Sequence, residues 1–225
     1  FNSYDKFTHK SIDERKQNMA ENFYVHTRGQ IDPSKLSAVI PLGAELAAES
    51  VAAGSERAFV GTVMTGNNAG GGVAFGQFFN SLDDFVKVMD AFATSSTYGK
   101  IMEHGMSVSF RNIAKFCDVP FSGPTDPQRK YVVYTRGTSH IAQADLVGLI
   151  SEAAPMFAES GAQSFRLARI MTGNEAGDFL LGVTYSSMAE IEATYDAIAK
   201  SPVAEKIYSS MAVNLRTIAK IQGMA

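Results

Sequence analysis

One stretch of this chain occurs twice. The sequence MTGNNAG at residues 64–70 returns as MTGNEAG at residues 171–177, with a single residue changed. Further matches follow in the same order: TRG at 27–29 and 135–137, and RNIAKF at 111–116 against RTIAKI at 216–221. The order and spacing hold over roughly ninety residues per copy, which is longer than the repeats of solenoid proteins. The sequence therefore predicts two homologous domains in tandem.

The repeats divide the chain into four predicted parts: an N-terminal arm at 1–22, a first repeat at 23–116, a proline-rich linker at 117–129 and a second repeat at 130–225. The arm is polar. The linker, CDVPFSGPTDPQR, contains three prolines together with Ser and Gly, which is typical of an extended connection.

Each repeat is predicted to contain six elements in the same order. The segments NFYVHTRG and KYVVYTRG alternate and are rich in β-branched and aromatic residues, as strands are. A helix follows each of them, and then two strands joined at the MTGN turn. Ser81 with Asp84, and Ser187 with Glu190, are typical of the start of a second helix, and a last strand ends each repeat. The order βαββαβ predicts the α+β ferredoxin-like fold.

Alternation within the strands predicts which side chains share a face. The apolar residues of the last strands are expected to face the helices: Met106, Val108 and Phe110, and Met211, Val213 and Leu215. The opposite face is then polar in both repeats: Tyr24, His26, Arg28, Ser107, Ser109 and Arg111 in the first, and Val132, Tyr134, Arg136, Ala212, Asn214 and Arg216 in the second. This face either meets solvent or, if the two sheets pack together, lines an enclosed cavity.

The duplicated βαββαβ unit, with its TRG, MTGN and R-x-I-A-K landmarks, resembles the dimeric α/β-barrel superfamily, which includes antibiotic-biosynthesis monooxygenases, NIPSNAP-like proteins and stress-responsive barrel proteins. The resemblance implies two ferredoxin-like domains packed sheet to sheet as an intramolecular barrel, with a ligand pocket in or beside it. Members that bind haem or run cofactor-free oxygenation use particular His, Trp, Asn or Tyr residues. This chain has no Trp, and none of its histidines is repeated between the copies.

Two residues of the polar face are candidates for catalysis. His26 can take or give a proton near neutral pH, and its counterpart in the second repeat is Tyr134. The alternative for His26 is a hydrogen-bonded filler of the core. No set of His, Cys or carboxylates has metal-ligand spacing, so no metal site is predicted.

Repeated arginines are the stronger signal for a ligand. A guanidinium that points into a cavity requires an anionic partner, so these positions favour an anionic substrate. The alternative is that each arginine pairs with a surface carboxylate. The predicted substrate-binding residues are Tyr24, Arg28, Arg136, Ser109, Arg111, Asn214 and Arg216.

Composition limits the partners. The formal net charge of −3 argues against nucleic acid, because phosphate binding requires clustered Lys and Arg. No apolar run approaches the roughly 18 residues that span a bilayer, so no membrane span is expected. The expected partners are a small-molecule ligand and further copies of the chain. The compartment stays open, with the cytoplasm favoured over export after processing.

Three functions are compatible with these observations. The favoured one is a cofactor-free oxygenase or isomerase that acts on an anionic or aromatic substrate in the cavity between the sheets. The second is a protein that binds a small molecule, including haem, without turnover. The third is a structural barrel that forms oligomers.

Overall fold

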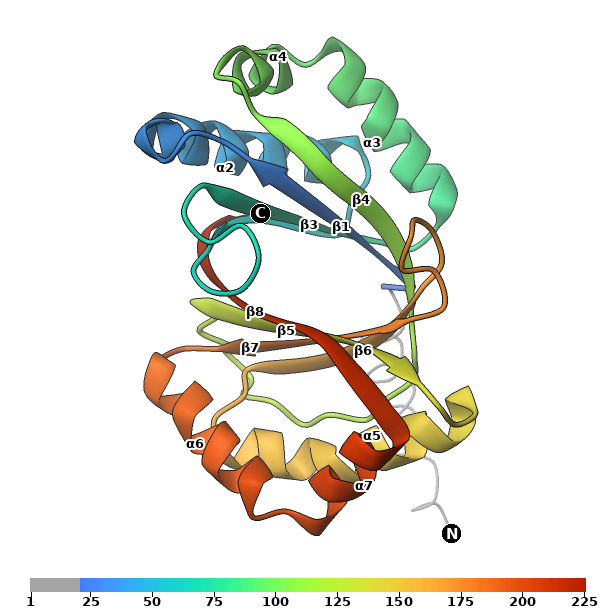
Figure 1. The fold of residues 1–225 in the computed structure, drawn as a ribbon. Helices are drawn as coiled ribbons and strands as arrows, with labels where there is room; N and C mark the ends of the chain where they lie inside the picture. The colour runs from blue at the N-terminus through green and yellow to red at the C-terminus, as the bar shows by residue number, and fades with distance from the viewer. Residues whose placement is uncertain (1–20) are drawn as a thin grey trace, which may run out of the picture.

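The computed structural model describes residues 21–225, so the predicted arm lies outside the described residues except for its last two positions (Figure 1). The first half contains β1 (Phe23–Gln30), a 3-10 turn η1 (Pro33–Lys35), α2 (Leu36–Ala53), β2 (Arg57–Val63), β3 (Gly72–Phe79), α3 (Leu82–Thr94), α4 (Ser96–Glu103) and β4 (Ser107–Phe116). The second contains β5 (Tyr131–Ser139), α5 (Gln143–Glu159), β6 (Ser164–Ile170), β7 (Phe179–Tyr185), α6 (Met188–Ala199), α7 (Pro202–Ser210) and β8 (Met211–Met224). The predicted α+β fold is confirmed.

The second helical region of each half is divided into two helices, where the sequence suggested one. Ser95 ends α3 with an extended backbone, and its hydroxyl oxygen accepts the N–H of Tyr98 at 3.0 Å, which starts α4. Ser201 lies at the matched position, and Pro202 occupies the first turn of α7, where a missing N–H has no consequence. The cap residues therefore change the direction of the chain before the last strand.

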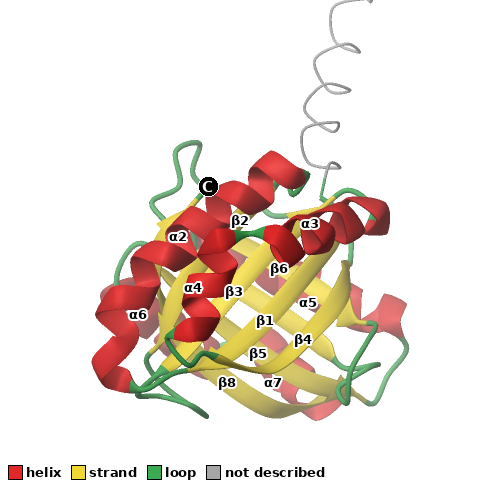
Figure 2. Ribbon diagram, turned by 90° about the horizontal axis from the view of Figure 1, so that it is seen from above, coloured by secondary structure: helices red, strands yellow, loops and turns green. Residues whose placement is uncertain are grey.

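The eight strands form one closed barrel in the order β1-β3-β2-β8-β5-β7-β6-β4. Each half supplies a four-stranded antiparallel sheet, and the two sheets are joined by β2 with β8 and by β4 with β6. Figure 1 shows the two sheets facing each other, with α2, α3 and α4 outside one and α5, α6 and α7 outside the other. Figure 2 shows α2, α3 and α4 lying across the outer face of the first-half strands. The predicted intramolecular barrel is confirmed.

Three apolar clusters follow from this arrangement. One lies between sheet and helices in each half, and its members include Val25 and Phe79 in the first and Val133 and Phe165 in the second. The third lies inside the barrel and draws on both halves, with Tyr24 and Tyr134 among its buried members. The two halves therefore share a core in addition to strand edges.

The repeated MTGN segment joins each half to the last strand of the other. Oγ1 of Thr65 accepts the backbone N–H of Ile218 at 3.0 Å, and Oγ1 of Thr172 accepts that of Ile113 at 2.9 Å. The methionine before each threonine donates its N–H to the carbonyl of the same isoleucine, at 2.8 and 2.7 Å. The motif is thus repeated because the barrel needs the same contact at two symmetric places.

A β-bulge in each last strand reverses the predicted faces. Arg28 pairs with Phe110 while the next residue, Gly29, pairs with Val108, so Ser109 is an extra residue in β4. Asn214 is the equivalent extra residue in β8. One additional residue moves every later side chain to the other face, so the expectation for the last strands was wrong after these positions.

The segment Pro33–Ala53 is long and apolar enough to cross a membrane by length and composition alone, contrary to the expectation from the sequence. A helix that packs on a sheet passes the same test. Here α2 buries Val39, Leu46 and Ala47 and packs on β2 and β8 of the barrel.

Candidate functional site

Two pockets are candidates for a functional site. The first, here called the side pocket, lies between the outer face of the second-half sheet and α5, α6 and α7, and holds about 650 Å³ of space including its open mouth. The second, here called the mouth pocket, lies at one end of the barrel interior and holds about 560 Å³ on the same measure. Both are mostly apolar with a few polar groups, as small-molecule sites are.

The side pocket exists because one aromatic layer of the first half is missing from the second. In the first half the rings of Phe75, Phe92 and Tyr98 pack in sequence, with centroids 6.3 and 5.8 Å apart. The matched positions in the second half hold smaller side chains that line the side pocket: Leu181, Ile198 and Ala204. The first half fills this space with its own core, whereas the second half leaves it open.

Arg216 is the charged group of the side pocket. Its Nε donates to Oγ1 of Thr135 at 3.2 Å, and its Nη2 donates to the hydroxyl of Tyr208 at 3.2 Å. The guanidinium carbon lies 5.4 Å from the ring centre of Tyr195. No carboxylate of residues 21–225 forms an ion pair with Arg216. The guanidinium of Arg216 thus places a positive charge beside an apolar pocket.

Two tyrosines that line the side pocket, Tyr185 and Tyr195, are neutral phenols near neutral pH. Burial raises the pKa of Tyr185 to about 12. Burial also raises the pKa of Tyr195, although the positive charge of Arg216 acts in the opposite direction. Among the described residues, those lining the pocket include no His, Asp or Glu. The pocket can therefore donate hydrogen bonds and stabilise negative charge, but its walls contain no general base.

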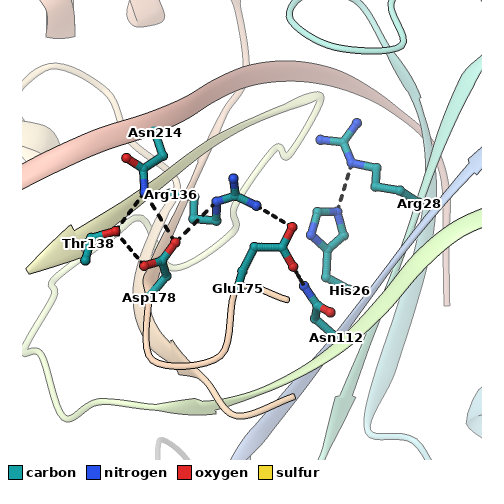
Figure 3. Close-up of polar contacts among 8 residues, drawn as sticks. All are labelled: His26, Arg28, Asn112, Arg136, Thr138, Glu175, Asp178 and Asn214. Atoms are coloured by element: carbon teal, nitrogen blue, oxygen red, sulfur yellow. Dashed lines mark hydrogen bonds and ion pairs between the residues drawn. The ribbon is translucent and has the colours of Figure 1, made fainter. Parts of the chain in front are cut away.

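The predicted catalytic His26 is buried inside the barrel, as the alternation of β1 suggested, but it lines neither pocket. Figure 3 shows His26 beside Arg28. Its Nε2 accepts a hydrogen bond from Nε of Arg28 at 3.1 Å, and its ring stacks on Tyr134 with centroids 4.6 Å apart. Burial, with a contribution from Arg28, holds the pKa of His26 well below its ordinary value, so the ring is neutral. The Nη2 of Arg28 is buried without a partner among the described residues.

Arg136, the counterpart of Arg28, is paired. It lies 2.7 Å from Oε1 of Glu175 and 3.6 Å from Oδ2 of Asp178, both in the loop between β6 and β7 (Figure 3). The other carboxylate oxygen of Glu175 accepts a hydrogen bond from Asn112 at 2.8 Å. In the first half Asn68 matches Glu175, and the glycine run at 70–72 matches Asp178. The two arginines are repeated, but only one has acidic partners.

Tyr24 and Tyr134 meet at the centre of the barrel. Their hydroxyl oxygens lie 2.6 Å apart, and both side chains line the mouth pocket. Burial raises the pKa of Tyr134 to about 12 and that of Tyr24 well above its ordinary value. Tyr134 is thus a neutral phenol rather than a base near neutral pH.

The remaining predicted residues lie elsewhere. Arg111 was expected inside the barrel, but it faces α3, where Nη1 lies 3.2 Å from Sδ of Met89. Arg216 faces α6 and α7 for the same reason, the bulge two residues earlier in its strand. Ser109 is exposed, and Asn214 is exposed and bonds Thr138 and Asp178 at the surface. The expected placement of these four residues in the interior cavity was wrong.

The sequence interpretation missed the small residues of the side pocket and the arginines of the mouth pocket. A signal for the side pocket was present in the repeat, because an aromatic residue in one copy matches a smaller residue in the other at three contacting positions. The arginines of the mouth pocket had no such signal in the local sequence. Arg57, Arg129 and Arg166 come from separate elements that only the barrel brings together.

Solved structures with the same fold cover nearly the whole chain. A chlorite dismutase from Candidatus Nitrospira defluvii, in complex with imidazole, matches with a TM-score of 0.61 and 10% identity over 92% of this chain and 94% of that one. A candidate monooxygenase from Fusobacterium nucleatum matches with a TM-score of 0.65 and 10% identity, over 91% and 94%. A haem-binding protein from Thermus thermophilus matches with a TM-score of 0.56 and 11% identity, over 90% and 91%. At these identities the likeness establishes the fold.

The described residues do not fit a haem held by histidine or cysteine. Haem iron takes an axial His, Cys, Met or Tyr ligand. Neither pocket is lined by a histidine or cysteine of residues 21–225: His26 is enclosed beside Arg28, His104 ends α4, His140 follows β5 and Cys117 follows β4. His9 lies outside the described residues.

Sequence comparison gives the family. No curated protein matches the chain by sequence. The family model described as a domain of unknown function, DUF6854, matches twice, at residues 21–116 and 129–221. The two matches correspond to the two halves of the barrel, and the chain belongs to the DUF6854 family, with two copies of the domain in one polypeptide.

Proposed function

We propose that this protein binds a small anionic or aromatic molecule in the side pocket and acts on it as a cofactor-free oxygenase or isomerase. The observation that carries the proposal is the aromatic layer present in the first half and absent from the second, which leaves an apolar pocket beside Arg216. An open apolar pocket leaves apolar surface in contact with water, so its presence in only one half favours a ligand that covers this surface.

The chemistry follows from the polar groups. Arg216 and the phenols beside it would stabilise a negatively charged oxygen, because charge and hydrogen-bond donors converge there in an apolar setting. The described lining residues include no His, Asp or Glu, so a suitable substrate ionises by itself, as an enol or an acidic phenol does. The resulting electron-rich anion can react with dioxygen, or take its proton back at another carbon. These are the two reaction types proposed.

The side pocket suits this chemistry better than the cavity between the sheets. His26, the only histidine of the described interior, is closed off behind Tyr134 and accepts a hydrogen bond from Arg28. A base must lie within hydrogen-bond reach of the proton that it removes. The structural likeness to a candidate monooxygenase supports the oxygenase type by analogy.

Filling the pocket tests the proposal. Ile198→Phe with Ala204→Tyr restores two members of the first-half layer, and the anionic aromatic dye 8-anilinonaphthalene-1-sulfonate reports binding by fluorescence. The filled variant is expected to bind the dye at least tenfold more weakly, about 1.4 kcal/mol, while its thermal stability is unchanged or higher. Arg216→Met is expected to weaken binding without filling the pocket.

Turnover is measured separately. Oxygen uptake with anthrone, an enolisable aromatic ketone, should occur in the natural protein and fall at least tenfold in Arg216→Met. The matched control is Arg111→Met, which removes the equivalent arginine of the filled first half and should leave dye binding and oxygen uptake unchanged. Dye binding without any oxygen uptake would favour the second candidate, a binding protein without turnover. Equal dye binding in the filled variant would contradict the proposed site.

A further inference from the structure

The mouth pocket carries a cluster of positive charge. Arg57 starts β2, Arg129 precedes β5 and Arg166 lies in β6, and all three side chains line this pocket. Glu21 pairs with two of them: its Oε1 lies 2.6 Å from Nε of Arg57, and its Oε2 lies 3.2 Å from Nη2 of Arg166. Three cations thus share one carboxylate among the described residues.

Arg129 is the unsatisfied member of the cluster. Its Nε is buried and has no hydrogen-bond partner among residues 21–225. Burial lowers the pKa of Arg129, and the positive charges of Arg57 and Arg166 act in the same direction against a partial compensation by Glu21. A buried donor without a partner has lost its hydrogen bonds to water, so an anion that accepts from Nε of Arg129 would be stabilising.

The walls of the mouth pocket are aromatic. The guanidinium of Arg57 lies 4.2 Å from the ring centre of Phe78, and that of Arg166 lies 5.2 Å from the ring centre of Phe116. These contacts hold the charged groups against apolar surface at the edge of the pocket. At the inner end, the paired hydroxyls of Tyr24 and Tyr134 are the polar groups. One of these two hydroxyls donates to the other, which leaves the second proton available to a ligand.

We propose that the mouth pocket is a second binding site, specific for an aromatic carboxylate. The carboxylate would meet Arg129 and Arg166, the ring would pack on the phenylalanine walls, and a polar substituent at the far end of the ring would meet the tyrosine pair. The mouth pocket is separate from the side pocket, because the two pockets lie on opposite faces of β5. Val132 and Tyr134 face the mouth pocket, whereas Val133 and Thr135 face the side pocket.

Calorimetric titration of the full chain with 4-hydroxybenzoate tests this site. Binding to the natural protein is expected in the micromolar to millimolar range, and Arg129→Met should weaken it at least tenfold. Lys130→Met is the matched control, because Lys130 is the neighbouring exposed cation, and it should change nothing. Arg129→Lys keeps the charge with fewer donors and should give an intermediate affinity, which provides a second test if the methionine variant folds poorly.

The side-pocket variant separates this proposal from the previous one. Ile198→Phe with Ala204→Tyr should leave the affinity for 4-hydroxybenzoate unchanged even where it removes dye binding. Loss of 4-hydroxybenzoate binding in that variant would assign the ligand to the side pocket and overturn the second site. No measurable binding to the natural protein, or equal binding to Arg129→Met, would overturn it as well. Failure of the dye experiment alone would leave the second site standing.

Discussion

The hydroxyl pair of Tyr24 and Tyr134 links the two halves at the centre of the barrel. Each residue comes from the first strand of its half, and their oxygens lie 2.6 Å apart. Both phenols have a pKa raised mainly by burial, so the folded state favours their neutral forms. Removal of one hydroxyl leaves the other buried without its partner, which costs about 1–3 kcal/mol.

We therefore predict a loss of stability at high pH. A group whose pKa is raised on folding contributes stability below its unfolded pKa, near 10, and this contribution disappears as the pH rises toward the folded value of about 12. Urea unfolding from about pH 8 to 11 should show a falling free energy of unfolding. In Tyr134→Phe the value at neutral pH should be lower and the decline above pH 10 shallower. If the free energy of unfolding declines equally in both proteins, groups other than Tyr134 control its pH dependence.

The same substitution is expected to lower stability more at Arg136 than at Arg28, its matched arginine in the first half. Arg28→Met removes a buried guanidinium that has no carboxylate partner among the described residues, so the free energy of unfolding should change by less than about 1 kcal/mol. Arg136→Met leaves Glu175 and Asp178 without their cation and should lower it by about 1–2 kcal/mol, a value reduced by their partial exposure. Chemical denaturation of both variants compares them directly, and a larger loss in Arg28→Met would contradict the assigned partners.

The repeated MTGN hairpins hydrogen-bond each half to the last strand of the other. Thr65→Val removes the oxygen that accepts the Ile218 N–H and should lower the free energy of unfolding by about 1–2 kcal/mol. Hydrogen exchange at the Ile218 amide should become faster in this variant. Thr65→Ser, which keeps the oxygen, is the control. Unchanged exchange in the valine variant would show that the contact with Met64 suffices.

The elements also show what the sequence could and could not predict. The duplication could be predicted from the repeated sequence motifs. The side chains of β1 and β5 that face the barrel interior could be predicted from alternation, because no bulge interrupts either strand. The last strands each contain one extra residue, Ser109 and Asn214, and nothing in their side chains marks them as bulges. A single unrecognised insertion reverses the face, which is why Arg111 and Arg216 were assigned to the wrong side.

The two pockets could not be predicted from the alternation pattern of any single strand. To predict the side pocket, one must know that residues 181, 198 and 204 lie close together in space. Each of these aliphatic residues is ordinary on its own. The mouth pocket unites arginines that lie 37 or more residues apart along the chain, so only the closed topology reveals their proximity. Composition could not predict it, because the chain is acidic overall.

The interior shared by the two halves predicts that they unfold together. The interior cluster draws on all eight strands of the barrel, and each sheet covers both edges of the other. Urea denaturation followed by a fluorophore placed in either half should give superimposable transitions. Two separate midpoints would show that one half is stable without the other.

The strand order has a further consequence for a chain leaving the ribosome. β2 lies early in the sequence, but its outer edge pairs with β8, which follows every other strand of the barrel. Until β8 has emerged, the nascent first half presents an uncovered row of amide and carbonyl groups, a template for unwanted pairing with neighbouring chains. A chaperone that shields this edge during translation would raise the yield of soluble protein, and slowing synthesis between the two halves would lower it.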